Sequence, residues 1–294
     1  MNILAHSHKL ALGTAQFGLK YGLANAADKV PRDMVEQLLK VASAFNITML
    51  DTAIAYGDSE QVLGLHNLAK FEIVSKLPAV PSNCLNVEEW VLEQTMSSLK
   101  RLKTDKLHDL LLHRPAQLLG TNGEKIYKSI LKLKEQGMVD QIGVSVYGPD
   151  ELSELIKRFD FDVIQAPMNI FDRRMEHTEM LKHLKKTGVT IHIRSAFLQG
   201  LLLMPSEKVP VCFAPWAPLI KQYHQWLNQQ SLSPLQACLS YLNQHSDIDK
   251  IIVGVDNIWQ LKQIIAAIDT PITDIPDFLQ STDEGLLNPS RWQR

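Results

Sequence analysis

The chain has 294 residues, of which 45% are apolar and 21% charged, and its formal net charge is −2. This composition allows a large buried core and differs from that of disordered chains. It contains no basic stripe typical of nucleic-acid binding, and no run approaches the roughly 18 apolar residues of a membrane span. We therefore expect neither nucleic acid nor a membrane as a partner.

The N-terminal segment lacks the charged start, apolar stretch and small-residue cleavage site of a secretory signal, so we expect a cytoplasmic protein. The cysteines Cys84, Cys212 and Cys238 are odd in number and widely spaced. This pattern argues against a disulfide framework and against a zinc site. We interpret all three as small buried apolar residues.

Short apolar runs alternate with amphipathic segments along nearly the whole chain, which is typical of parallel α/β architecture. Most of the runs are continuous aliphatic stretches such as DLLLHR and KIIVGV, as expected of strands covered on both faces. The predicted strands are Lys9–Gly18, Ile47–Thr52, Phe71–Lys76, Leu107–His113, Gln141–Val146, Val163–Pro167, Thr190–Ser195 and Lys250–Gly254. Eight strands favour closure into a (β/α)8 TIM barrel, an α/β fold that commonly uses about 250 residues as one domain.

Helical stretches separate the predicted strands. They are Arg32–Ala44, Ser59–Leu68, Val87–Leu102, Glu124–Gln136, Pro149–Arg158, Met175–Lys186, Pro234–His245 and Ile258–Ile268. Ser59 is predicted to cap its helix, and Pro234 follows Ser233 at a first-turn position. Gly137 and Gly188 indicate the ends of two helices.

One long interruption of this alternation runs from Gly200 to Ser233. It mixes prolines with aromatic residues, among them Phe213, Trp216 and Trp226, and we expect an inserted loop or short helix over one end of the barrel. The tail, from about residue 270 to 294, is expected to fold back over the barrel mouth. Neither segment indicates a second domain, so we predict a single domain over residues 1–294.

Polar residues occupy three successive strand ends, where barrels of this kind carry their catalytic groups. Asp51 ends the second strand and Tyr56 lies in the loop after it, while Lys76 ends the third strand and His113 the fourth. Each residue alone has a structural explanation, such as a turn cap, a surface lysine or a satisfied histidine. Together they form a coherent proton-transfer group.

The chemistry of this group follows from the phenol. With a pKa of about 10, a tyrosine is a poor acid at neutral pH unless its anion is stabilised. Lys76 beside Tyr56 would supply that stabilisation, and Asp51 would keep Lys76 charged and oriented. His113 could then exchange a hydrogen bond with the substrate oxygen.

These positions resemble those of the aldo-keto reductases. The likeness covers nearly the whole barrel, and the DTAxxYGxSE segment is its most specific part. The other matching segments are LGTAQFG, SKL, LLLHRP, GVS, QxxxN and SxFLQGLL. The resemblance implies an NAD(P)H-dependent oxidoreductase that reduces a small aldehyde or ketone to an alcohol. In that reaction Tyr56 would be the general acid, Asp51 and Lys76 would tune it, His113 would orient the substrate, and the nicotinamide would provide the hydride.

The resemblance also implies how the cofactor is held. Ser145 and Gln165 would bind the nicotinamide carboxamide, and Ser195 with the Leu198 to Gly200 backbone would bind the pyrophosphate. A phosphate site after the seventh strand also agrees with the general rule for such barrels. The predicted cofactor-binding residues are Gly13, Thr14, Asp51, Ser145, Gln165, Arg194, Ser195, Leu198, Gly200, Gly254, Asn257 and Lys262. No metal is predicted.

Three features depart from the family pattern. Val146 stands where many members have an asparagine, which removes one amide contact. Arg194 stands where the family commonly has a tyrosine stacked on the nicotinamide, although a guanidinium can also lie flat against a ring. After the eighth strand, Asp256 lies near the place of the cations that bind the NADP 2′-phosphate, and only Lys262 is nearby. A carboxylate repels a phosphate, so the choice between NADP and NAD stays open.

Two further hypotheses compete with a reductase. One is a nicotinamide-binding regulatory or scaffold protein with little or no turnover. The other is a metal-dependent barrel hydrolase or a metal-free isomerase, which would need His and carboxylate clusters at several strand ends. The fifth, sixth and eighth strands offer none, and the histidine pair of His6 to His8 precedes the first strand. The oligomeric state is left open.

Overall fold

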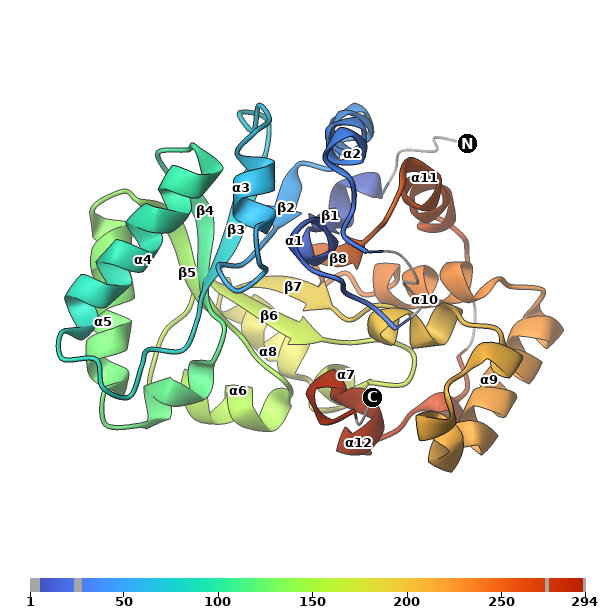
Figure 1. Cartoon of the computed structure of the whole chain (residues 1–294). Helices are drawn as coiled ribbons and strands as arrows, with labels where there is room; N and C mark the ends of the chain where they lie inside the picture. The colour runs from blue at the N-terminus through green and yellow to red at the C-terminus, as the bar shows by residue number, and fades with distance from the viewer. Residues whose placement is uncertain (1–5, 24–27, 273–274, 293–294) are drawn as a thin grey trace.

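The computed structural model describes residues 6–23, 28–272 and 275–292. Eight parallel strands follow one another around a closed barrel, and the last pairs with the first (Figure 1). They are β1 (Leu10–Gly13), β2 (Met49–Asp51), β3 (Glu72–Leu77), β4 (Leu107–Leu112), β5 (Val139–Ser145), β6 (Val163–Pro167), β7 (Thr190–Arg194) and β8 (Lys250–Gly254). The predicted (β/α)8 fold in a single domain is confirmed.

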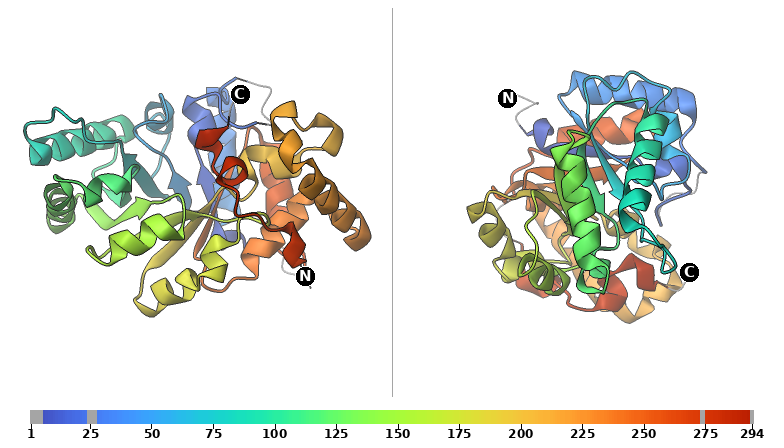
Figure 2. Two further views of the ribbon diagram at one scale, coloured as in Figure 1. Left: turned by 90° about the horizontal axis from the view of Figure 1, so that it is seen from below. Right: turned by 90° about the vertical axis from the view of Figure 1, so that its left-hand side faces the viewer.

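Helices surround the strands, as the two views of Figure 2 show. They are α1 (Ala15–Gly18), α2 (Arg32–Ala44), α3 (Ser59–Leu63), α4 (Val87–Leu102), α5 (Gly123–Glu135), α6 (Pro149–Ile156), α7 (Arg174–His177), α8 (Met180–Lys186), α9 (Ala217–Gln230), α10 (Pro234–Asn243), α11 (Ile258–Ala267) and α12 (Glu284–Leu287). Within the described ranges, no helix combines the length and apolar character that crossing a bilayer requires.

A small apolar cluster inside the barrel determines where the polar strand ends project. Its members, separate from the larger core between strands and helices, are Ala11, Met49, Val74, Leu111, Val163 and Ile252. Side chains two residues apart on a strand share a face. Asp51, Lys76, His113 and Gln165 each follow one of these residues by two positions, so all four lie at the C-terminal end of the barrel interior.

The first predicted strand, Lys9–Gly18, is wrong in its second half. β1 ends at Gly13, and Ala15–Gly18 forms the short helix α1, in which the Leu19 N–H donates to the Ala15 carbonyl at 2.9 Å. In a short apolar run, periodicity alone does not distinguish a strand from a buried helical turn. The turn at Thr14 ends the strand and brings α1 over the barrel mouth.

Two helix predictions also need correction. The stretch Met175–Lys186 is divided into α7 and α8, because Glu179 adopts a left-handed backbone with φ of 52°. The helix that begins at Ser59 ends at Leu63, five residues early, and Ser59 makes no capping hydrogen bond. The Ser59 hydroxyl instead donates a hydrogen bond to the Thr14 carbonyl, just after β1.

Other helix-end predictions are confirmed. Ser233 and Gln236 form a capping box at the start of α10, with Pro234 in the first turn. Gly137 and Gly188 have φ of +73° and +81°, values at which side-chain-bearing residues are strained. They end α5 and α8 as the sequence indicated.

The segment after Gly200 is more ordered than the expected loop or short helix, because it contains the 14-residue helix α9. Phe213, Tyr223 and Trp226 are buried, whereas Cys212 is exposed, which corrects the prediction that every cysteine is buried. Cys212 lies in a 3-10 helix in which only the neighbouring Phe213 is buried.

The tail folds back as predicted. The Trp292 ring packs edge-on against Phe213 at 4.9 Å between centroids, and Pro289 and Ser290 reach the barrel mouth. α12 lies beside α7 in Figure 1. Residues 273–274 and 293–294 of the predicted tail lie outside the described residues.

Candidate active site

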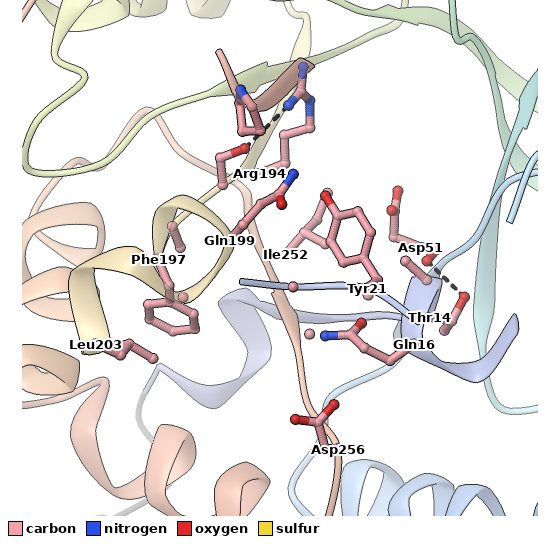
Figure 3. A pocket seen from close by; sticks show the side chains of 18 of the residues that line it. Thr14, Gln16, Tyr21, Asp51, Arg194, Phe197, Gln199, Leu203, Ile252 and Asp256 are labelled. Carbon is pink, nitrogen blue, oxygen red and sulfur yellow. Dashed lines mark hydrogen bonds between the residues drawn. The ribbon is translucent and has the colours of Figure 1, made fainter. Parts of the chain in front are cut away.

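A cavity of ≈ 760 Å³ opens at the C-terminal ends of the strands (Figure 3). Ligand pockets for small molecules and cofactors are commonly of this size. Ten of the predicted site residues line it: Gly13, Thr14, Asp51, Tyr56, His113, Ser145, Arg194, Ser195, Gly200 and Gly254. The structure therefore brings most of the predicted catalytic and cofactor residues around one space.

A buried ion pair lies beneath this cavity. The Lys76 Nζ donates to Asp51 Oδ2 at 2.7 Å and to the Thr52 carbonyl at 2.8 Å. Lys76 is 0% and Asp51 4% exposed. Burial lowers the pKa of Lys76, and the Asp51 carboxylate opposes that shift. An unpaired buried ammonium would cost several kcal/mol of stability, so Lys76 and Asp51 hold each other in place as an ion pair.

Gln165 and Ser145 extend this pair into a hydrogen-bonded chain. The Gln165 Nε2 donates to Asp51 Oδ1 at 2.7 Å, and the Ser145 hydroxyl donates to Gln165 Oε1 at 3.0 Å. Both carboxylate oxygens of Asp51 are thus occupied. Gln165 is fully buried and does not line the cavity, so its contact with a carboxamide stays a prediction, whereas Ser145 does line it.

Tyr56 and His113 lie above the ion pair. The Lys76 Nζ is 5.0 Å from the centre of the Tyr56 ring, and the rings of Tyr56 and His113 meet edge-on at 5.8 Å. Burial, and then the Asp51 charge, raise the pKa of Tyr56 above 10, while Arg194 opposes them. The expected lowering of the Tyr56 pKa does not prevail, because burial and then the Asp51 charge outweigh it. Tyr56 therefore carries its proton at neutral pH and is available as an acid.

His113 is uncharged at neutral pH. Burial first, and then the charge of Lys76 and of two arginines, lower the pKa of His113 to about 3. A neutral imidazole has one N–H donor and one acceptor nitrogen. His113 can therefore give a hydrogen bond to a carbonyl oxygen without competing with Tyr56 as a proton source.

The buried neutral state of His113 predicts acid sensitivity. An unfolded histidine has a pKa of about 6.5, so between that value and about 3 only the unfolded chain binds this proton. Lowering the pH through this window should cost up to about 1.4 kcal/mol of unfolding free energy per pH unit. Urea unfolding at pH 7, 6 and 5 measures it. His113→Asn should lose less stability than the wild type, and equal losses would contradict the assignment.

Two glycines hold the Tyr56 loop against the first strand end. A Cβ on Gly18 would lie 1.9 Å from the Tyr56 carbonyl oxygen, and one on Gly57 would lie 2.4 Å from the Gly18 oxygen. Gly57 also has φ of +58°. The Ser59 hydroxyl donates to the Thr14 carbonyl at 2.9 Å. Any side chain at Gly18 would displace the backbone of Tyr56.

The sequence reasoning missed Glu60, which anchors the same loop. Its carboxylate is 2% exposed and accepts hydrogen bonds from Ser75 at 2.6 Å, Ser98 at 2.6 Å and Arg101 at 2.7 Å. Glu60 thus joins α3 to β3 and α4. The final letter of DTAxxYGxSE was the available signal, because a buried carboxylate needs several donors.

The turn after β7 has an unusual backbone. Ser195, Leu198 and Gln199 have φ of 61°, 47° and 53°, and Gly200 follows with 94°. Left-handed non-glycine residues gather at functional sites, and successive turns of this kind can direct backbone N–H groups toward an anion. Ser195 and Gly200 line the cavity, while the Leu198 side chain is buried outside it. This turn fits the predicted pyrophosphate contact.

The predicted residues near β8 fit less well. Asn257 caps α11 by accepting from the Gln260 N–H at 3.0 Å, and Lys262 is exposed; neither lines the cavity. Asp256 does line it, and burial raises the pKa of Asp256. Arg194 is the sole Lys or Arg among the described residues that line the cavity. Among the described residues, no Lys or Arg of β8 or of the segment after it lines the cavity.

Several aromatic and polar residues of the cavity were not predicted. Tyr21, near the centre of Figure 3, and Gln16 come from the segment after β1, while Tyr147 follows β5 and the 67% exposed Trp259 lies on α11. Phe213, Trp216, Tyr223 and Trp226 of the long insertion do not line the cavity. In the described ranges, no group of three His, Cys, Asp or Glu side chains could hold a metal ion.

Comparison with known proteins agrees with this geometry. The model of the Aldo/keto reductase family matches residues 9–276. The chain belongs to this family. Aldo-keto reductases are oxidoreductases that use NAD(P)H. The family assignment therefore confirms the resemblance found in the sequence motifs.

Individual relatives of this aldo-keto reductase are distant. An uncharacterised oxidoreductase of Bacillus subtilis is 25% identical over 88% of this chain and 90% of its own. An NADH-specific methylglyoxal reductase of Escherichia coli is 24% identical over 90% and 91%. The holo form of a Bacillus halodurans aldo-keto reductase superposes with a TM-score of 0.71 at 20% identity, covering 90% of this chain and 88% of that one. At these identities the structural likeness concerns the fold.

Proposed function

We propose that this family member reduces a small aldehyde or ketone to an alcohol with NAD(P)H, and that Tyr56 is its general acid. The observation that carries the proposal is the protonated Tyr56 phenol in the cavity above the buried Lys76–Asp51 pair, beside neutral His113. A phenol, an ammonium and an imidazole in this arrangement suit proton delivery to a carbonyl oxygen.

Each residue has a defined task. Tyr56 donates its O–H to the carbonyl oxygen, and the His113 N–H gives that oxygen a second hydrogen bond. When bound, the nicotinamide supplies the hydride to the carbonyl carbon. As the oxygen gains negative charge, the phenol proton moves to it, and Lys76 stabilises the resulting phenolate. Asp51 holds Lys76 in place during this transfer.

The cofactor would be held chiefly by neutral groups. Ser145 and the turn from Ser195 to Gly200 line the cavity, and the positive-φ backbone of that turn suits a pyrophosphate. The opposite end carries Asp256 and the exposed Trp259. Asp256 would accept hydrogen bonds from ribose hydroxyls and repel a 2′-phosphate, so we infer a preference for NADH. The NADH-specific relative from Escherichia coli supports this direction.

Replacing Asp256 tests the preference. Asp256→Ser should tighten NADPH binding relative to NADH by about tenfold, equivalent to about 1.4 kcal/mol, because the like charge is removed. Fluorescence titration with both cofactors measures the ratio. Asp105→Ser, an exposed position before β4, is the matched control. If the ratio of NADPH to NADH affinity is unchanged in Asp256→Ser, Asp256 does not contribute to cofactor selection.

The reductase and the regulatory protein make different predictions. Titration with NADH and NADPH should show binding, and a panel of aldehydes and ketones should then oxidise the bound cofactor. Tight binding with no oxidation by any carbonyl would favour the regulatory protein. Failure of both cofactors to bind would contradict both hypotheses.

A further inference from the structure

Two guanidiniums enclose the Tyr147 side chain at the cavity wall. The Arg194 Cζ lies 4.9 Å and the Arg114 Cζ 5.8 Å from the centre of the Tyr147 ring. Arg114 also donates to the Tyr147 hydroxyl at 3.2 Å. Arg194 is held by the Val146 carbonyl at 2.8 Å and the Ser195 hydroxyl at 3.2 Å. The end of β7 and the segments after β4 and β5 thus bring two guanidiniums to one tyrosine ring.

These two charges lack the counter-ions that a third guanidinium has. Arg174, which also bonds this loop, pairs with Asp172 at 2.8 Å and with Glu284. The ion pairs formed within residues 6–23, 28–272 and 275–292 include neither Arg114 nor Arg194. Arg194 is partly buried and Arg114 is exposed, and a guanidinium without a carboxylate is a ready binding group for an anion.

The arginine pair lies close to the proposed acid. Tyr147 and Arg194 line the same cavity as Tyr56 and His113. The charges of both arginines act on His113, and that of Arg194 also acts on Tyr56. Among the described residues that line this end of the cavity, Asp51 is the other charged group, and Lys76 neutralises it; the Glu151 carboxylate accepts from the Tyr147 N–H at 2.9 Å without lining the cavity. The substrate end therefore carries a net positive charge.

We propose that the natural substrate is a carbonyl compound that carries an anionic group, a carboxylate or a phosphate, and that Arg114 and Arg194 bind this group. The proposal rests on the reductase function proposed above. Tyr147 is the positioning residue, because its ring and hydroxyl hold the two guanidiniums together. The carbonyl would then lie at Tyr56 while the anion lies against the arginines.

Matched substrate pairs test this charge recognition. Succinic semialdehyde is compared with butanal, and glyceraldehyde 3-phosphate with glyceraldehyde. In at least one pair the anionic member should have a kcat/KM about tenfold or more above its neutral partner, as expected of a paired charge. The pair that shows the difference identifies carboxylate or phosphate. The preference should shrink as ionic strength rises from about 0.05 to about 0.5 M.

Charge-removing variants link the preference to the two arginines. Arg114→Gln and Arg194→Gln should each bring the ratio of anionic to neutral kcat/KM toward one, mainly through KM for the anionic member, and Arg194→Lys should restore part of it. NADH affinity is measured in each variant, because Arg194 is also a predicted cofactor contact. Arg158→Gln, an exposed arginine just beyond α6, is the matched control and should keep the wild-type ratio.

The outcomes separate this inference from the reductase function. Reduction of neutral and anionic members at equal efficiency would overturn the inference and leave the reductase function standing. A preference that persists in both glutamine variants would also overturn it. No reduction of any member, despite bound NADH, would contradict the reductase function itself.

Discussion

Tyr56→Phe should reduce turnover of the best carbonyl substrate by about 10²–10⁴-fold, the usual contribution of a positioned acid. The variant removes the proton donor and keeps the ring that packs against His113. Cofactor affinity should change little, because the ring itself stays in place. Steady-state kinetics together with cofactor titration separates these two effects.

The control for this variant is Tyr127→Phe. Tyr127 lies on the outer helix α5 and does not line the cavity, and its hydroxyl donates to the Asp160 carbonyl at 2.7 Å. It should leave turnover intact. If Tyr56→Phe retained more than about a tenth of wild-type turnover, where loss of a positioned acid costs far more, another group would have to be the acid.

Asp51→Asn should destabilise the fold by about 3–5 kcal/mol and also slow turnover, because it leaves the Lys76 ammonium buried without its counter-charge. The two side chains are 1% and 5% exposed, so water cannot replace the lost carboxylate. Urea unfolding measures the loss. Turnover should fall because Lys76 would no longer be held below the Tyr56 ring.

A double variant distinguishes the buried charge from a general packing defect. Asp51→Asn combined with Lys76→Met removes both charges and should recover most of the stability while turnover stays low. Glu36→Gln, which breaks the exposed pair with Lys40, should leave the free energy of unfolding nearly unchanged. A similarly small loss in Asp51→Asn would contradict the ionised, mutually dependent pair.

The sequence predicted the barrel well because its strands are short, apolar and regularly separated by helices. Two helices, α2 and α4, were correct to the residue, and in α4 the Asn86 cap agrees with the periodicity. Asp51, Lys76 and His113 could be placed together because strand ends of one barrel face meet at one mouth. Tyr56 was found because the loop after β2 is short and its motif is specific.

The remaining differences have physical causes. α1 was predicted as strand because its apolar residues pack over the mouth in one helical turn, which leaves no helical period to detect. Glu60 was overlooked because the donors that satisfy it come from β3 and α4, distant in the chain. The contacts among Arg114, Tyr147 and Arg194 likewise depend on three separate strand ends that only the closed barrel brings together.

The substrate end and the cofactor end of the cavity differ in charge. Arg114 and Arg194 contact Tyr147 near the proposed acid, whereas Asp256, after β8, lines the cavity with a carboxyl group. This distribution favours an anionic carbonyl compound at one end and an unphosphorylated ribose at the other. Arg194 and Asp256 are both positions at which the chain departs from the common family pattern.

Hydride transfer itself is measured most directly with NADH deuterated at the transferable position of C4. A single turnover of the bound cofactor with a carbonyl substrate should place deuterium on the carbon that bears the new hydroxyl. The rate of this transfer should be strongly reduced in Tyr56→Phe. Tight NADH binding without any deuterated alcohol would contradict the proposed reductase.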